Sequence, residues 1–197
     1  MRLSTAVRRL RSIAERAQQV SPFASVPALL SVYAFGPVLE SPADLDYVQV
    51  ACVVDLPLAD VIWGTSPPWA ASLAHLLEMD KAPVERHWRP TEWPVSNHAI
   101  RRPLRLWSAS EGIDVSSMDA LSTGRVESLR LPEPHPAVLR EQLAAELAAS
   151  LTHVRQVEEL YWEADWRRGH RGDGFHPEDH LWRAVHGYLD LLAAVHG

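Results

Sequence analysis

The 197-residue chain is poor in sulfur and has an uneven supply of positive charge. Cys52 is its one cysteine, which excludes an internal disulfide and a cysteine-based zinc site. Lys81 is its one lysine, and residues 21–80 contain neither lysine nor arginine. No apolar run approaches the roughly 20 residues that a membrane span needs. A disulfide framework and a membrane-spanning helix are therefore not expected.

The composition is that of a folded globular protein. Apolar residues make up 47% of the chain and charged residues 22%, which excludes disordered and fibrous classes. The formal net charge is −6, whereas a protein that binds nucleic acid through its phosphates is usually basic. A nucleic-acid partner is therefore disfavoured.

The charge is segregated along the sequence. Residues 21–80 carry seven acidic side chains and no basic ones, whereas residues 81–110 carry one lysine and five arginines against two acids. Acidic and basic groups thus fall into neighbouring blocks, as a local site for a metal ion and a phosphate would need.

Hydrophobic patterning predicts an α+β fold of two parts. Residues 1–130 read as an α/β domain with a mixed sheet, and residues 131–197 as a helical hairpin. The expected strands are 28–35, 44–54, 84–88 and 104–107, and the expected helices are 3–20, 68–79, 116–124, 136–167 and 177–195.

Each helix of the predicted hairpin carries an apolar stripe that we expect to face inward. In the first helix the stripe consists of Leu139, Leu143, Leu147, Leu151, Val154, Val157 and Tyr161. In the second it consists of Leu181, Val185, Tyr188, Leu189, Leu192 and Val195. A homodimer built through these helices is a further hypothesis.

The N-terminal helix over residues 3–20 is amphipathic and rich in arginine. It is compatible with a transit peptide or a membrane-surface helix. Neither a cleavage site nor a long apolar segment follows it, which favours a helix docked on its own domain. We therefore expect a cytoplasmic protein without a membrane partner.

Two carboxylates at the start of the second predicted strand carry the clearest chemical signal. Asp44 and Asp46 are two residues apart, so an extended backbone places both side chains on the same side. Such a pair needs a cation or a proton to neutralise it. Mg²⁺ suits carboxylate oxygens together with phosphate. Gly36 closes the preceding strand, eight positions before Asp44.

This arrangement resembles the nucleotidyltransferase superfamily, the polymerase-β-like fold of small aminoglycoside-modifying enzymes. The family pattern is a strand, Gly-Ser or Gly-Gly, a helix or turn, and then Asp-x-Asp on the next strand. The resemblance implies that Gly36 lies at the nucleotide phosphates and that Asp44 and Asp46 bind Mg²⁺. It also implies metal-dependent transfer of a nucleotidyl group from a nucleoside triphosphate to a small-molecule or protein hydroxyl.

The sequence departs from this family pattern at three points. Pro37 follows the glycine and removes a backbone N–H that could contact phosphate. The gap before Asp44 is short. No residue is a clear match for the third family carboxylate, although Glu85 on the next predicted strand fits best by order. These departures favour the alternative function, a catalytically inactive nucleotidyltransferase-like binding or interaction module.

The basic block supplies the arginines for a phosphate site. Under the resemblance, Arg86, Arg101 and Arg102 would neutralise the triphosphate, and the interleaved tryptophans could stack on a base. The competing interpretation is a solvated face with core indoles. Because neighbours on a strand alternate, Arg86 and His87 lie on opposite faces.

Two other polar groups have both a chemical and a structural interpretation. Asn97 and His98 could act on a ligand, but a turn with a hydrogen-bonded histidine is favoured. His176, Asp179 and His180 could bind a metal, but Pro177 and the acids after it favour helix capping. Cys52, in the middle of a strand, is expected to be buried and inert.

Longer stretches of the chain, among them YAFGPVLESPADLDYVQVACVVDLP and WPVSNHAIRRPLRLWS, are similar to a family of uncharacterised actinobacterial proteins. This second resemblance supports a bacterial cytoplasmic protein and implies no mechanism.

Overall fold

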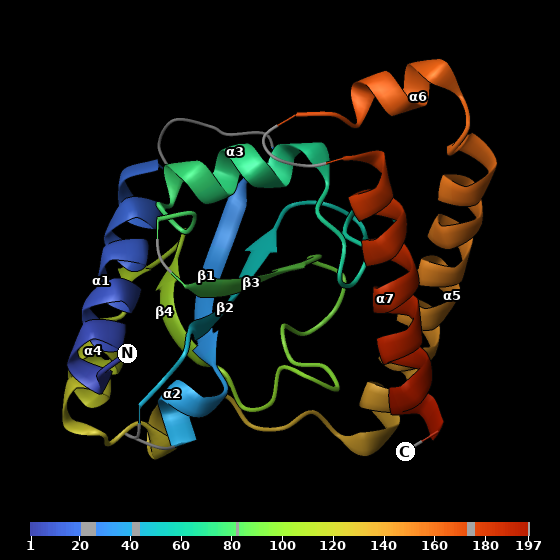
Figure 1. The fold of residues 1–197 in the computed structure, drawn as a ribbon. Coiled ribbons are helices and arrows are strands. Elements are labelled where there is room, and N and C mark those ends of the chain that lie inside the picture. The colour runs from blue at the N-terminus through green and yellow to red at the C-terminus, as the bar shows by residue number, and fades with distance from the viewer. Residues whose placement is uncertain (21–26, 41–43, 82, 173–175, 197) are drawn as a thin grey trace.

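A five-stranded mixed sheet forms the centre of the molecule (Figure 1). The computed structural model describes residues 1–20, 27–40, 44–81, 83–172 and 176–196. The strand order is β3–β2–β1–β4–β5, which confirms the predicted α+β class with a mixed sheet and flanking helices. The strands are β1 (Leu29–Phe35), β2 (Val48–Val54), β3 (Val84–Arg89), β4 (Leu104–Ser108) and β5 (Gly112–Ile113).

The strand directions follow from the lengths of the connections. β1 runs antiparallel to both β2 and β4, and β4 runs antiparallel to β5. β2 and β3 are parallel, and the chain between them contains helix α3 (Pro68–Leu76). A parallel pair requires such a crossover. β2, which has few polar residues, lies inside the sheet between β1 and β3.

The main hydrophobic core lies on one face of the sheet. Helices α1 (Leu3–Val20), α3 and α4 (Val115–Thr123) bury apolar side chains there against alternate residues of the strands. Leu10, Ile13 and Ala17 of α1 are fully buried. The N-terminal helix is therefore docked on its own sheet, as its apolar periodicity predicts.

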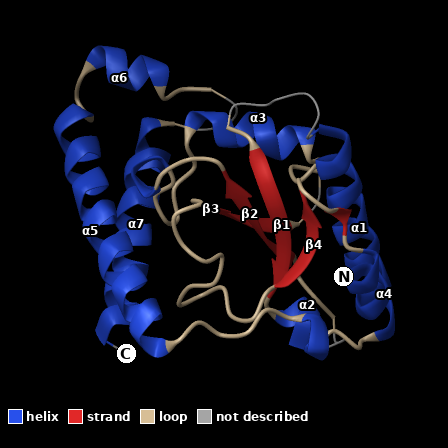
Figure 2. Cartoon of the chain, turned by 180° about the vertical axis from the view of Figure 1, so that it is seen from behind, coloured by secondary structure: helices blue, strands red, loops and turns tan. Residues whose placement is uncertain are grey.

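A second core joins the other face of the sheet to the C-terminal helices. Phe35 and Ala51 on the strands pack in one cluster with Leu143 of α5 (Pro136–Leu160) and Leu191 of α7 (Pro177–His196). Helices α5 and α7 pack side by side, as the predicted hairpin requires (Figure 2). The division at residues 130 and 131 stays a prediction, since the core is shared across it.

The hairpin differs from the prediction in its length and in its buried faces. The expected helix over 136–167 is two helices, because α5 ends at Leu160 and α6 (Ala164–Gly169) follows a break. On α7 the buried residues include Ala184, Gly187 and Leu191. The predicted stripe lies partly in solvent, with Val185, Leu189 and Val195 among the exposed apolar side chains.

The close approach of α7 to Trp63 and Gly64 explains why its buried face differs from the predicted one. Gly187 lies against the backbone of Trp63 and Gly64, and a Cβ at position 187 would overlap the Trp63 carbonyl oxygen. Small residues therefore define the inner face of α7, and the larger apolar residues point elsewhere.

The short elements were the hardest to predict. The expected strand over 44–54 begins only at Val48, and a one-turn helix, α2 (Pro37–Glu40), connects β1 to the loop before it. Two 3-10 turns, η2 (Leu58–Asp60) and η3 (Glu127–Leu129), precede α3 and α5 respectively. Within the described residues, no helix is long and apolar enough to cross a membrane.

Candidate functional site

Gly36 ends β1 in a backbone conformation that favours glycine. Its φ is +71°, in the left-handed region where a side chain is strained. A Cβ at this position would also overlap the side-chain oxygen of Gln49 on β2. The turn therefore favours glycine here, and a larger residue would also displace the end of the Gln49 side chain. The side chain that fills the space beside it is an amide.

A polar row crosses the sheet next to Gly36. Phe35, Gln49 and Glu85 are in register on β1, β2 and β3. Gln49 Nε2 donates to Glu85 Oε2 at 2.9 Å, and the other Glu85 oxygen lies 3.0 Å from His87 Nε2. These side chains are on the sheet face that α7 covers, and they form the centre of the candidate site.

The row stabilises the ionised form of Glu85. The hydrogen bond with His87 is the largest influence that holds the pKa of the Glu85 carboxyl below its ordinary value. Hydrogen bonds with Gln49 and Tyr47 act in the same direction, and partial burial opposes them. Glu85 is thus a carboxylate whose neighbours are an amide, a phenol and an imidazole.

Asp44 and Asp46 lie in the loop before β2, and both are exposed. Leu45 between them is buried, and its N–H donates to the carbonyl of Met1 at 2.9 Å, which ties the loop to the N-terminus. Within the part of the chain that the structure describes, no three His, Cys, Asp or Glu side chains are placed to hold a metal ion. That holds for Asp44, Asp46 and Glu85 as well. Their role as metal ligands stays a prediction.

The three predicted phosphate-binding arginines have different surroundings. Arg86 lies with His75 and Asp80 along a hollow beside α3, on the opposite face of β3 from Glu85. Burial, followed by the nearby Arg183, lowers the pKa of Arg86.

Arg101 and Arg102 lie in the loop before β4. Arg101 Nε donates to the carbonyl of His98 at 3.3 Å. Arg102 forms an ion pair with Glu127, and its φ is +44°. The structure does not place these two arginines and Arg86 around one centre.

A network that the sequence did not reveal continues from His87 toward α7. The His87 ring stacks on Trp63 with a centroid separation of 4.7 Å. Trp63 Nε1 donates to Asp190 Oδ2 at 2.6 Å, and His98 Nε2 lies 3.0 Å from the same oxygen. These interactions lower the pKa of Asp190, although partial burial is the largest influence and opposes them.

A cavity of about 390 Å³ opens beside this network. It lies between the turn after η2, β3 and α7. Two indole rings, two imidazole rings and a guanidinium contribute to its wall. The lining residues are Trp63, Gly64, His87, Trp182, Arg183, His186, Gly187, Leu189 and Asp190. The cavity adjoins the polar row at His87.

A buried ion pair lies next to the Trp63 ring of this network. Arg89 Nη2 lies 2.7 Å from Glu146 Oε1, and both side chains are about 1% exposed. Gln142 Nε2 donates to the same glutamate oxygen at 2.8 Å, and the Arg89 guanidinium lies over the Trp63 ring. This polar stripe of α5 lies beside the predicted apolar stripe, of which Leu143 and Val157 are buried.

The structural interpretations of the minor candidates are correct. Asn97 Oδ1 accepts from the N–H groups of Ala99 and Ile100, which makes a turn. Asp179 Oδ2 accepts from the N–H of His176, which caps α7. Cys52 is fully buried, and burial raises the pKa of its thiol to about 12, so it is not a nucleophile.

Comparison with protein families now adds one finding. A family model described as a domain of unknown function, DUF7711, matches residues 1–197. The chain belongs to the DUF7711 family. No curated protein and no solved structure matches it. The function of this DUF7711 chain must therefore be argued from its own residues.

Proposed function

We propose that this DUF7711 protein is a catalytically inactive small-molecule-binding module built on a nucleotidyltransferase-like sheet. The observation that carries the proposal is Gln49. An uncharged amide lies beside Gly36 and donates to Glu85, so Glu85 is the carboxylate of the polar row and the side chain next to it adds no second negative charge for Mg²⁺. An amide offers no charge to balance a divalent cation.

The nucleotidyltransferase-like part of the proposal rests on the element order. A helix precedes β1, Gly36 and a short helix follow it, and β2 and β3 are then connected through α3. Glu85 lies on the strand next to β2, in the order expected for a third carboxylate. The arrangement supports descent from a transferase fold, and the exposure of Asp44 and Asp46 supports the loss of its metal site.

The cavity beside α7 is the proposed ligand site. Its indole and imidazole rings suit a flat ring, and Arg183 suits a negative charge. A volume of about 390 Å³ is within the range of small-molecule sites. A nucleotide combines both chemical features and is the first ligand class to test.

A thermal-shift series with ATP, GTP, CTP and UTP, with and without Mg²⁺, tests the proposal. We expect that any stabilisation by a nucleotide does not require Mg²⁺ and is the same in Asp44→Asn/Asp46→Asn. The variant Trp182→Ala, which removes one wall of the cavity, should abolish it. Trp162→Ala is the matched control, because Trp162 is exposed and outside the cavity.

The competing function is metal-dependent nucleotidyl transfer to a small-molecule or protein hydroxyl. It requires Mg²⁺-dependent stabilisation that is lost in Asp44→Asn/Asp46→Asn, together with turnover of the triphosphate. That pair of results would contradict the proposal. Absence of any shift would remove nucleotides as ligands of the cavity and would leave transfer equally unsupported.

A further inference from the structure

A group of histidines lies in a second hollow, beyond the cavity described above. Three imidazoles line it, His153 from α5, His170 from the end of α6 and His180 from α7. Arg183 and the hydroxyl-bearing Thr65 and Ser66 also line it. The hollow has a volume of about 200 Å³, which is room for several waters at about 30 Å³ each.

The histidine rings are held close together by their surroundings. The His170 ring stacks on the Trp166 ring, with centroids 4.0 Å apart. The His170 and His180 rings pack edge to face, with centroids 4.9 Å apart. His170 Nδ1 lies 2.8 Å from the Trp166 carbonyl oxygen, so Nδ1 carries the proton and donates. The other nitrogen of His170 becomes a donor only when the ring is protonated.

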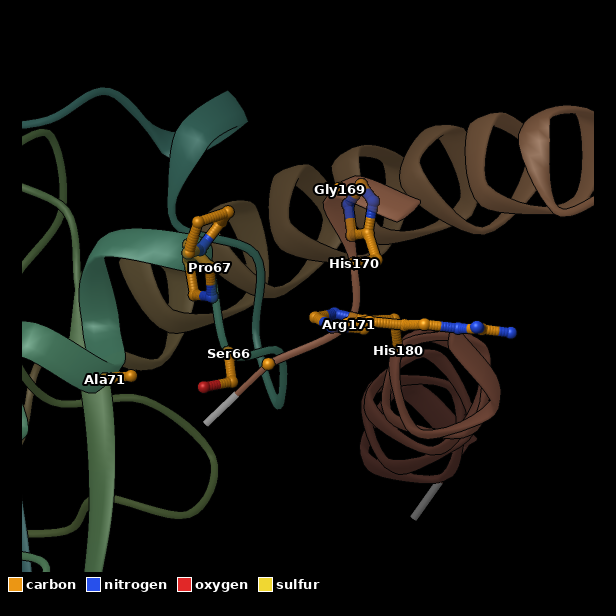
Figure 3. Close-up of a pocket in the computed structure, with 9 residues that line it drawn as sticks. Ser66, Pro67, Ala71, Gly169, His170, Arg171 and His180 are labelled. Atoms are coloured by element: carbon orange, nitrogen blue, oxygen red, sulfur yellow. The ribbon is translucent and has the colours of Figure 1, made fainter. Parts of the chain in front are cut away.

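Figure 3 shows the smaller hollow that adjoins this one and shares Ser66, Pro67, His170 and His180 with it. Ser66 and Pro67 lie on one side, and His170 and His180 lie across from them on the C-terminal segments. Three separate parts of the chain therefore converge on one polar opening.

Among the described residues that line the opening, Arg183 carries a positive charge, and the imidazoles do so only when they are protonated. Burial lowers the pKa of His153, and the neighbouring His170 lowers it further. Burial also lowers the pKa of His180, with His170, Arg183 and His153 acting in the same direction and Asp179 opposing them. Of the described residues that line the hollow, the acid is Asp60 on η2, which is exposed.

Burial and the neighbouring groups thus disfavour a proton on His153 and on His180. An anion at this place would reverse the effect, because it would stabilise three imidazolium groups and Arg183 together. The described residues offer no three-ligand geometry for a metal ion, so a cation is not the expected occupant.

We infer that the hollow formed by His153, His170, His180 and Arg183 is a binding site for a tetrahedral oxyanion, either free phosphate or the phosphate group of a small monoester. This site goes beyond the proposed function, because its three histidines lie outside both the polar row at Gly36 and the proposed ligand cavity, with which it shares Arg183. It requires neither a nucleotide in the cavity nor a loss of catalysis.

Binding at this site is linked to protons in a defined direction. In the unliganded protein His153 and His180 have lowered pKa values, and the bound anion raises them, so binding takes up protons. Affinity is therefore greatest at low pH and falls as the pH rises through the pKa values of the bound state. For each proton taken up, the fall is about tenfold per pH unit in that range.

Titration of the histidine ring signals by NMR, followed with inorganic phosphate, ribose 5-phosphate and sulfate, tests the inference. Sulfate serves for the pH series because its charge is constant across it. We expect the oxyanions to shift the ring signals of His153, His170 and His180 and to raise the pKa values of His153 and His180. Tighter binding of ribose 5-phosphate than of phosphate would identify a monoester as the occupant, and the reverse order would identify the free ion.

Two single variants on different helices keep the test independent of any one folding defect. His180→Gln and His153→Gln should each weaken sulfate binding at low pH by about tenfold, the loss of one charge-assisted hydrogen bond. His196→Gln is the control, since His196 is exposed at the end of α7 and outside the hollow. Unshifted histidine signals with all three oxyanions would overturn the inference, as would binding of Zn²⁺ in their place.

Discussion

At the scale of single residues, Gln49 is the side chain that favours a binding module over a metal-dependent transferase. It occupies the space beside Gly36 and donates to Glu85, so part of the hydrogen-bonding capacity of the β3 carboxylate is taken by an amide. Asp44 and Asp46, which the sequence pattern predicts as metal ligands, are exposed in the loop before β2. The Asp-x-Asp pattern therefore did not identify the residue of β2 that reaches the site, which is Gln49.

A second residue-scale feature is the buried pair Arg89 and Glu146. Removing only the carboxylate, in Glu146→Leu, leaves a buried guanidinium without its counter-charge and should cost about 3–5 kcal/mol in the free energy of unfolding. The double variant Arg89→Met/Glu146→Leu removes both charges and should recover most of that loss. Urea unfolding monitored by tryptophan fluorescence measures both. A double variant no more stable than the single one would show that the pair does more than balance charge.

This pair also explains why the buried face of α5 could not be predicted. Gln142, Glu146 and Ser150 repeat every four residues and are all buried, one position away from the predicted leucine stripe. Apolar periodicity identifies leucines, not polar residues, as the buried side of a helix. Burial of Glu146 becomes favourable only because Arg89 on β3 lies opposite it. Information of this kind depends on tertiary contacts and is absent from local sequence.

At the scale of elements, strands and long helices were predictable because their signals are strong. Apolar runs located β1 and β2, and the amphipathic repeat located α1 with its bounds at Leu3–Val20. The strand start at Val48 and the break after Leu160 were not predicted, since both depend on how the ends of these elements pack. On α7, the buried face depends on the close approach of Gly187 to Trp63 and Gly64, which the sequence pattern does not predict.

That close approach gives a prediction at the same scale. Gly187→Ala should destabilise the protein by about 1–3 kcal/mol, because the added methyl overlaps a backbone carbonyl that has little room to move. Gly169→Ala is the matched control, since a Cβ there meets nothing within 4 Å. Hydrogen exchange should report faster opening of α7 in the first variant alone. Equal stability of the two variants would contradict the packing described for α7.

At the scale of the whole molecule, the charge segregation has a different meaning from the one that the sequence favours. The acidic and basic blocks do not meet in one metal and phosphate centre among the described residues. Asp44 and Asp46 are exposed in the loop before β2, Arg86 lies beside α3, and Arg102 pairs with Glu127. The openings that combine rings and cations lie instead under and beside α7. Their residues come from sequence positions more than a hundred apart, so composition alone could not assemble them.

Mn²⁺ binding followed by electron paramagnetic resonance distinguishes the proposed inactive binding module from a metal-dependent transferase. Mn²⁺ substitutes for Mg²⁺ at oxygen ligands and can be counted per protein. The account predicts that the wild-type protein, with and without ATP, holds no more Mn²⁺ than Asp44→Asn/Asp46→Asn. Stoichiometric Mn²⁺ on the wild type that disappears in that double variant would contradict it and would restore the transferase interpretation.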